Sequence, residues 1–306
     1  MTSLEIRPYQ ASDWLAVVHV WNESVFKDPL TPERFWRLFL LDPNFRCEGF
    51  LVAELEGKLV GWMQVVTRAE QAWLTAFCVH PDRRREKVAT RLWEAHQKAL
   101  RKDGVQKILC NGYAPYYLFP GVDVDYKQAH SFLHSCGFQV HTDAVAMGMH
   151  LEGVATPPAI REARARLEGE GIEVRLFRRE DTLPLLEFTN THFPYWQDSL
   201  LDGLRQGNLE IMVALQQGEP VGLTQWENTY TDPPHGLAGR FGPFGIRDDM
   251  RSRGIGGVIF YSMIERAKAK GARYLWFGWA GGRNVAFYER MGCHITRRYV
   301  LYRREL

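Results

Sequence analysis

Apolar and polar positions along the chain predict two successive sets of similar elements. Residues 5–14 alternate as a strand and then change to a helical pattern, and residues 173–188 do the same. Each half continues with two apolar runs joined at a turn, Glu56-Gly57 in the first half and Gln217-Gly218 in the second. Because the elements match in order and spacing, we interpret the chain as an internal duplication.

The closest match between the halves lies where a strand is expected to lead into a helix. Residues 79–89 align with residues 246–256 without a gap, and the helical patterns that follow end at Gly104 and Gly271. A strand, a loop and a helix are therefore expected at both places.

A charged segment with a proline pair separates the two halves. It contains Pro157-Pro158 and few apolar residues, which is typical of a linker with a short helix. A chain of 306 residues is also longer than most single hydrophobic cores. We therefore predict an N-terminal domain over residues 1–152, a linker over 153–171 and a C-terminal domain over 172–306.

The composition describes an ordinary globular protein, with 45% hydrophobic residues and 38 basic against 36 acidic side chains. Such a balanced charge indicates no nucleic-acid partner. The sequence has no long uncharged apolar stretch for a signal peptide or a membrane span. Its five cysteines are scattered without paired spacing, which suits a reducing compartment. We expect a cytoplasmic protein without a membrane partner.

The loop of the second half has the features of an anion site. It lies between an apolar strand and a helix, so its N–H groups are free at the positive end of the helix dipole. Two glycines without a Cβ allow a phosphate to approach the backbone, and two arginines add positive charge. A purely structural turn is the alternative interpretation. The residues of this loop are Arg251, Ser252, Arg253, Gly254, Ile255, Gly256 and Gly257.

The pattern Arg251-x-x-Gly254-x-Gly256 resembles the Arg/Gln-x-x-Gly-x-Gly/Ala signature of the GNAT superfamily of N-acetyltransferases. Residues 284–292 look like a shortened form of that family's second block, Asn-x-x-Ala-x-x-Phe-Tyr-x-x-x-Gly-Phe. The resemblance covers the whole chain twice. It implies an α/β (α+β) fold of two GNAT domains, each a mixed, mostly antiparallel sheet flanked by helices. The sheet would splay beside its fourth strand, here about residues 237–246, and acetyl-CoA would enter the opening.

The resemblance also implies roles for single residues of the second half. Tyr288 would act as general acid toward the departing thiolate, although a packed aromatic ring is the alternative. Asn284 would reach the pantetheine or only cap its helix. Glu227 is the best-placed carboxylate for a general base, with His235 as runner-up and a solvated surface side chain as the alternative. The backbone amides expected to pair with pantetheine and polarise the thioester carbonyl are those of Phe244, Gly245 and Ile246.

The first half departs from the family pattern at its chemical positions. Lys87 stands in place of the first glycine, and Glu86 adds negative charge beside it. Leu133 occupies the position of Tyr288, and Ala129 that of Asn284. We therefore predict one active site per chain, in the second domain, beside a degenerate first domain whose CoA binding the sequence leaves open.

Two aromatic segments lie outside these motifs. The loop over residues 111–130 is rich in tyrosine, which indicates core packing or a contribution to a pocket. Tyr195, Trp196 and Asp198 follow the first helix of the second half, where the family's acceptor site commonly lies, and ordinary helix packing is the alternative.

The sequence thus predicts an acetyl-CoA-dependent N-acetyltransferase in which the amine attacks the thioester directly. The acceptor would be a primary amine of a small molecule or peptide, no metal is needed, and the protein would be a monomer or homodimer. The layout also resembles mycothiol synthase, which is the alternative enzyme. A non-catalytic CoA-binding or scaffolding protein is the alternative of another class.

Overall fold

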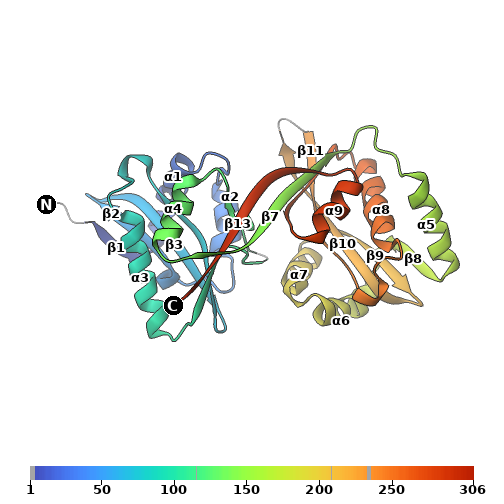
Figure 1. Ribbon diagram of the computed structural model, residues 1–306, viewed down its shortest axis with the longest axis horizontal. Coiled ribbons are helices and arrows are strands. Elements are labelled where there is room, and N and C mark those ends of the chain that lie inside the picture. Colours follow the sequence, from blue (N-terminus) through green and yellow to red (C-terminus); the bar gives the residue numbers. More distant parts are fainter. Residues whose placement is uncertain (1–3, 115, 208, 233–235) are drawn as a thin grey trace. The chain divides into compact units, whose positions relative to one another are not determined.

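The computed structural model describes residues 4–306 except 115, 208 and 233–235 (Figure 1). Its contacts divide the chain into two compact units. The first unit comprises Met1–Ala144 with Arg298–Leu306, and the second comprises Val145–Arg297.

The first unit is a sheet in the order β1-β2-β3-β4-β5-β13. Neighbouring strands are antiparallel except β4 and β5, which are parallel. Its elements are β1 (Glu5–Pro8), α1 (Trp14–Ser24), α2 (Pro32–Phe35), β2 (Phe50–Leu55), β3 (Lys58–Arg68), β4 (Gln71–Val79), α3 (Val88–Lys102), β5 (Lys107–Cys110), β6 (Val122–Asp123), α4 (Lys127–Ser135) and the end of β13 (His294–Glu305).

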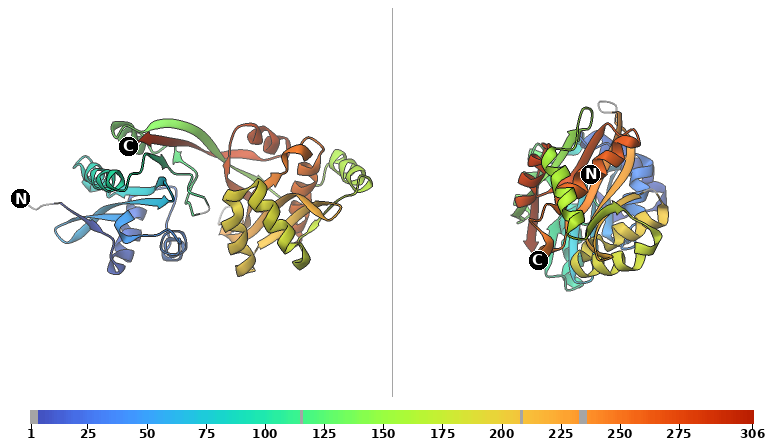
Figure 2. Two further views of the ribbon diagram at one scale, coloured as in Figure 1. Left: turned by 90° about the horizontal axis from the view of Figure 1, so that it is seen from below. Right: turned by 90° about the vertical axis from the view of Figure 1, so that its right-hand side faces the viewer.

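Helices cover both faces of this sheet (Figure 2). On one face α1 and α2 pack on the strands, where Trp21 stacks on Trp62 with ring centroids 5.2 Å apart. On the other face Leu92 of α3 and Leu133 of α4 are fully buried against Leu74 and its neighbours. Both helix pairs thus hide apolar stripes on a sheet whose strands are apolar on both faces.

The second unit has the same plan, with the order β7-β12-β11-β10-β9-β8 and a parallel pair β11–β12. Helices α6 and α7 cover one face, and α5, α8 and α9 pack into the core of the other. Its elements are the end of β7 (Gln139–His150), α5 (Pro158–Gly169), β8 (Ile172–Leu176), α6 (Thr182–His192), α7 (Gln197–Gln206), β9 (Leu209–Gln216), β10 (Glu219–Asp232), β11 (Gly236–Ile246), α8 (Ile255–Ala269), β12 (Tyr274–Ala280), α9 (Arg283–Arg290) and the start of β13.

A matching ion pair shows the duplication at atomic detail. Arg7 binds Asp13 at 2.7 Å, and Arg175 binds Asp181 at 2.6 Å. In both units the carboxylate also accepts the backbone N–H three residues before it. An arginine at the equivalent position of each unit therefore links the first strand to the turn that begins the first long helix.

Each sheet takes its strand beside the parallel pair from a distant part of the sequence. Residues 302–305 of β13 pair with β5 in the first unit. Residues 145–150 of β7 pair with β12 in the second. The first unit thus contains a segment that follows the whole second unit in the chain.

Both sheets open where the parallel pairing ends. Strand β5 pairs with β4 only as far as Cys110 and Leu74, although β4 continues to Val79. Strand β12 pairs with β11 only as far as Trp276 and Arg240. The expected α/β (α+β) class, with mixed, mostly antiparallel sheets flanked by helices, is confirmed.

Candidate active site

The two strand-loop-helix connections have the same backbone conformation. In each unit a short turn precedes two residues with positive φ, which are Arg85 (66°) and Lys87 (62°) in the first unit. In the second they are Ser252 (64°) and Gly254 (88°). A left-handed conformation costs a residue such as lysine about 1–2 kcal/mol. The first unit therefore retains the shape of the loop without its glycines.

The first-unit loop leaves backbone donors open at the start of α3. The first hydrogen bond of this helix runs from the N–H of Arg91 to the carbonyl of Lys87. No side chain caps the helix. The N–H groups of residues 88–90 are thus available at the positive end of a 15-residue helix, the arrangement that binds phosphate groups.

A cavity of about 860 Å³ lies in the first unit beside this loop. It runs between the ends of α1 and β4 on one side and the start of α4 on the other, and we call it the first-unit groove. Cavities of roughly 300–1,000 Å³ are usual for small-molecule and cofactor sites. Its lining includes Phe26, Val79, Lys87, Asn111, Tyr126 and Phe132.

Cations without acidic partners lie at the mouth of the groove. Arg85 and Lys87 form no ion pair with any described residue. The guanidinium of Arg84 donates to neutral acceptors, including the carbonyl of Ser24 at 3.0 Å and the side-chain amide oxygen of Gln128 at 3.0 Å. The loop therefore presents net positive charge to the groove.

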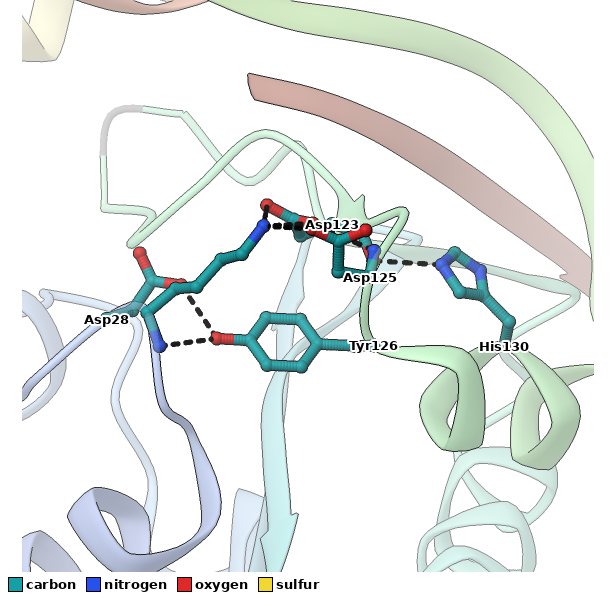
Figure 3. Close-up of polar contacts among 6 residues, drawn as sticks. Asp28, Asp123, Asp125, Tyr126 and His130 are labelled. Carbon is teal, nitrogen blue, oxygen red and sulfur yellow. Dashed lines mark hydrogen bonds and ion pairs between the residues drawn. The ribbon is translucent and has the colours of Figure 1, made fainter. Parts of the chain in front are cut away.

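Figure 3 shows how one lip of the groove is held. The ammonium group of Lys27 lies 3.1 Å from Asp123 and also pairs with Asp125, a contact that raises the pKa of Lys27. The hydroxyl of Tyr126 accepts the backbone N–H of Lys27 at 3.1 Å and donates to Asp28 at 3.1 Å. These contacts fix the segment after α1 against the segment before α4, so the groove has a preformed wall.

The arginines of the second-unit loop have acidic side chains beside them at the surface. Arg251 pairs with Asp248 at 2.5 Å, and Arg253 pairs with Glu170. Hydrogen bonds from Arg166 and Arg253 lower the pKa of Glu170, so this carboxylate is ionised at neutral pH. The predicted anion loop thus has acidic partners within the protein.

Helix α5 packs against this loop. The guanidinium of Arg166 donates to the carbonyl of Arg253 at 2.6 Å. A Cβ atom on Gly254 would lie 3.4 Å from Arg166, and one on Gly257 would lie 2.6 Å from Ile160. The glycine at 257 therefore permits the close approach of α5.

Aromatic rings cover the strand that was expected to pair with pantetheine. Phe193 and Trp196 stack with centroids 4.3 Å apart, and a Cβ atom on Gly245 would lie 2.6–2.7 Å from both. Phe244 also stacks on Phe287. The first unit has an equivalent pair, Phe77 and Phe132, and its groove is open nonetheless. The Phe193–Trp196 pair is thus the aromatic feature that distinguishes the second unit.

The structure brings some of the remaining predicted residues together, since the rings of Tyr288 and Phe244 lie 6.1 Å apart and a Cβ atom on Gly256 would lie 3.4 Å from Phe244. Tyr288 is packed among phenylalanines, with the Phe277 ring centroid 4.4 Å away, and burial raises its pKa. Asn284 is an exposed second residue of α9, whose N-cap is Gly282, so the capping alternative is wrong. Glu227 is half-buried on β10, while His235 lies outside the described residues. Of the loop residues, Ser252 is exposed and Ile255 is buried at the start of α8.

Sequence reasoning left CoA binding by the first unit open and allowed the loop over residues 111–130 to contribute to a pocket, but it assigned no site residue there. The cluster Arg83-Arg84-Arg85 with Lys87 is visible in the sequence, but a lysine at the glycine position indicated a damaged loop. Asn111, 5% exposed at the end of β5, carried no motif. A basic cluster before a helix was the available signal.

Neither a metal centre nor a membrane helix was found in the described part of the chain. No three His, Cys, Asp or Glu side chains there gather as ligands for a metal ion. None of its helices combines the length and the apolar character needed to cross a lipid bilayer.

Comparison with known proteins gives the family and the fold. The model of the Acetyltransferase (GNAT) family matches residues 14–138 and 177–293, whereas no curated protein matches. A fungal multi-domain GH3 beta-N-acetylglucosaminidase, described as having a GCN5-related glucosamine N-acetyltransferase region, superposes with a TM-score of 0.86 at 22% identity. That alignment covers 99% of this chain but only 38% of the fungal one.

Two further structures match along nearly their whole length. A GCN5-related N-acetyltransferase from Sphaerobacter thermophilus has a TM-score of 0.72 at 18% identity, covering 99% of this chain and 95% of that one. A tandem GNAT protein from the clavulanic acid biosynthesis pathway has a TM-score of 0.69 at 15% identity, covering 99% and 98%. At these identities the likeness concerns the fold.

Proposed function

This chain belongs to the acetyltransferase (GNAT) family and is an acyltransferase, and we propose that it transfers the acetyl group of acetyl-CoA to a primary amine, with the donor held in the first-unit groove. The observation that carries the proposal is the open groove of about 860 Å³ that ends on Arg85 and Lys87, two cations that form no ion pair with a described residue.

The residues of the groove fit the parts of acetyl-CoA. Arg85, Lys87 and the free N–H groups at the start of α3 would hold the pyrophosphate. Beyond Leu74, β4 has no partner on the β5 side, so its free edge can hydrogen-bond the amides of the pantetheine arm as an added strand does. The lining residues Phe77 and Phe132 supply apolar walls.

Acetyl transfer in the first-unit groove requires neither a general acid nor a general base from the protein. Acetyl-CoA supplies the thioester that the neutral amine attacks. A thiol has a pKa of about 8.5, so it can depart as a thiolate without a proton donor, and Leu133 provides none. The open groove lets solvent take up the proton of the amine.

The prediction of a cofactor site at Arg251–Gly257 stays a prediction. Three features weigh against it: the acidic partners of Arg251 and Arg253, the packing of α5, and the Phe193–Trp196 pair over Gly245. A donor site at the first-unit loop and one at the second-unit loop therefore predict opposite effects on acetyl-CoA binding when equivalent arginines are replaced.

Isothermal titration calorimetry with acetyl-CoA decides between the loops. We expect one site per chain, and Arg85→Asn with Lys87→Asn should weaken binding on the order of 100-fold, since hydrogen bonds to charged groups contribute about 1.5–3 kcal/mol each. Asparagine tolerates positive φ, so the loop should keep its shape. The control Arg251→Asn should bind as the wild type does; loss of binding in that control alone would move the site to the second unit.

A thiol-release assay then tests transfer to amines. The panel should include glucosamine, suggested by the description of the fungal relative, together with polyamines, amino acids and peptide N-termini. An acceptor should raise CoA release above the rate of hydrolysis. If acetyl-CoA binds and no primary amine accelerates release, the proposed acceptor class is wrong.

A further inference from the structure

The side chain of Asn111 is a polar group on the wall of the first-unit groove. It lines the groove, is 5% exposed, and makes no hydrogen bond with any described residue. Its amide atoms are not among the fully buried unpartnered atoms of the described residues, so they reach the open groove. Such a group is a candidate for binding a ligand.

The backbone places Asn111 at the apex of the opening between β4 and β5. Its N–H donates to the carbonyl of Leu74 at 2.9 Å, directly after the last paired residues of the two strands. Asn111 (φ 66°) and Gly112 (φ 79°) are both left-handed, which ends β5 and turns the chain away from β4. Asparagine is one of the few residues that adopts this conformation readily.

The apex is the place that the thioester end of the donor would reach. From Val79, beside the phosphate-binding loop, β4 runs four residues back to Thr75, or about 13 Å at 3.3 Å per residue. The hydroxyl of Thr75 is already bonded to Gln64 at 2.5 Å. At this depth the side-chain amide of Asn111 forms no hydrogen bond with a described residue.

Resting on the proposed function, we infer that Asn111 donates a hydrogen bond from its side-chain amide to the carbonyl oxygen of the bound acyl group. When the amine nitrogen attacks, a C–N bond forms and the C–S bond breaks. The thiolate leaves, and the ammonium proton passes to solvent. Negative charge gathers on the carbonyl oxygen during the attack, and the Asn111 amide stabilises it there.

Two substitutions remove the donor while keeping the left-handed backbone. Asn111→Gly deletes the side chain, and Asn111→Asp keeps its size but replaces the N–H donor with an acceptor. Both should lower kcat about 100-fold, the usual effect of removing one such donor. The Kd for CoA, which lacks the acetyl group, should not change.

Two readouts do not depend on the acceptor. The ratio of the Kd values for CoA and acetyl-CoA should fall about 10-fold in Asn111→Gly, equivalent to roughly 1.4 kcal/mol. Isotope-edited infrared spectra of bound acetyl-CoA, labelled with 13C at the carbonyl, should show a lowered stretching frequency in the wild type and a return to the solution value in both variants.

The outcomes separate this inference from the proposed function. If the folded wild type binds neither CoA nor acetyl-CoA, both fail. If it binds acetyl-CoA and either folded variant keeps the wild-type carbonyl frequency and kcat, the role of Asn111 is wrong and the cofactor site stands. Melting curves of both variants establish which of them is folded.

Discussion

Phe193 stacks flat on Trp196 in the second unit, with planes 10° apart, and the pair lies directly over Gly245. The first unit has Cys78 in place of Gly245 and Val25 in place of Phe193. Both first-unit residues line the groove. The first unit thus has an opening of about 860 Å³ over this strand, whereas aromatic packing covers the strand in the second unit, where an opening of about 590 Å³ lies beside Arg251.

Gly245→Ala should therefore destabilise the second unit without affecting the donor. A Cβ atom would lie 2.6–2.7 Å from both rings, and forced repacking of this kind costs about 2 kcal/mol. Urea unfolding measures the loss, and calorimetry should give an unchanged Kd for acetyl-CoA. The control Gly169→Ala has no atom within 4 Å of the new Cβ and should not destabilise the protein. A weaker Kd in Gly245→Ala would favour the second-unit site.

Lys87→Gly should change stability and binding in opposite directions. Glycine adopts the positive φ of residue 87 without strain, so the first unit should gain about 1 kcal/mol. The lost cation should weaken acetyl-CoA binding about 10-fold, and the weakening should shrink at high salt. Thermal melting and calorimetry at two ionic strengths measure both effects. Equal affinity at low salt would show that Lys87 does not face the phosphates.

Tyr288→Phe tests the sequence-based assignment of the general acid. With the donor in the first-unit groove, turnover should match the wild type, because the Tyr288 hydroxyl bonds to no described residue within its aromatic cluster. Steady-state kinetics with a saturating acceptor is the measurement. A large fall in kcat with acetyl-CoA affinity kept would restore the predicted role of Tyr288.

His96 should make the first unit sensitive to mild acid. The ring is 3% exposed, its Nε2 lies 3.1 Å from the carbonyl of Met63, and burial lowers its pKa to about 4. The unfolded chain binds a proton at His96 more readily than the folded chain does. The free energy of unfolding therefore loses nothing from His96 above pH 6.5 and declines as the pH falls from 6.5 toward 4. Between pH 6.5 and 5 the free energy of unfolding should drop by about 2 kcal/mol.

Urea unfolding at several pH values measures this drop. His96→Gln cannot titrate and should show a flatter dependence on pH. If the variant loses as much stability as the wild type, groups other than His96 cause the acid sensitivity.

The elements of both units were predictable because their periodicity is local. The turns at Glu56-Gly57 and Gln217-Gly218 and the strand-loop-helix connections follow from apolar spacing and from residues that favour turns. The conformation of the first-unit loop was harder to predict from the sequence. Sequence shows that Lys87 replaces a glycine, but the positive φ that it accepts depends on the surrounding fold.

The candidate site required knowledge of distant contacts. Nothing near Arg253 in the sequence shows that Glu170 neutralises it, and nothing near Gly245 shows that Trp196 covers it. Asn111 follows four residues of an ordinary strand, and its role depends on where β4 and β5 separate. Motifs record local chemistry, whereas the openness of a groove depends on long-range packing.

The strand exchange has a consequence for biosynthesis. Residues 302–305 pair with β5, yet they are translated after the entire second unit. While the ribosome is still making residues 145–297, the first unit exposes the edge of β5 and the apolar side chains that β13 later covers. Its groove therefore matures only after the second unit has emerged, so a fragment ending at the midpoint of the chain should need a chaperone or a supplied β13 peptide to fold.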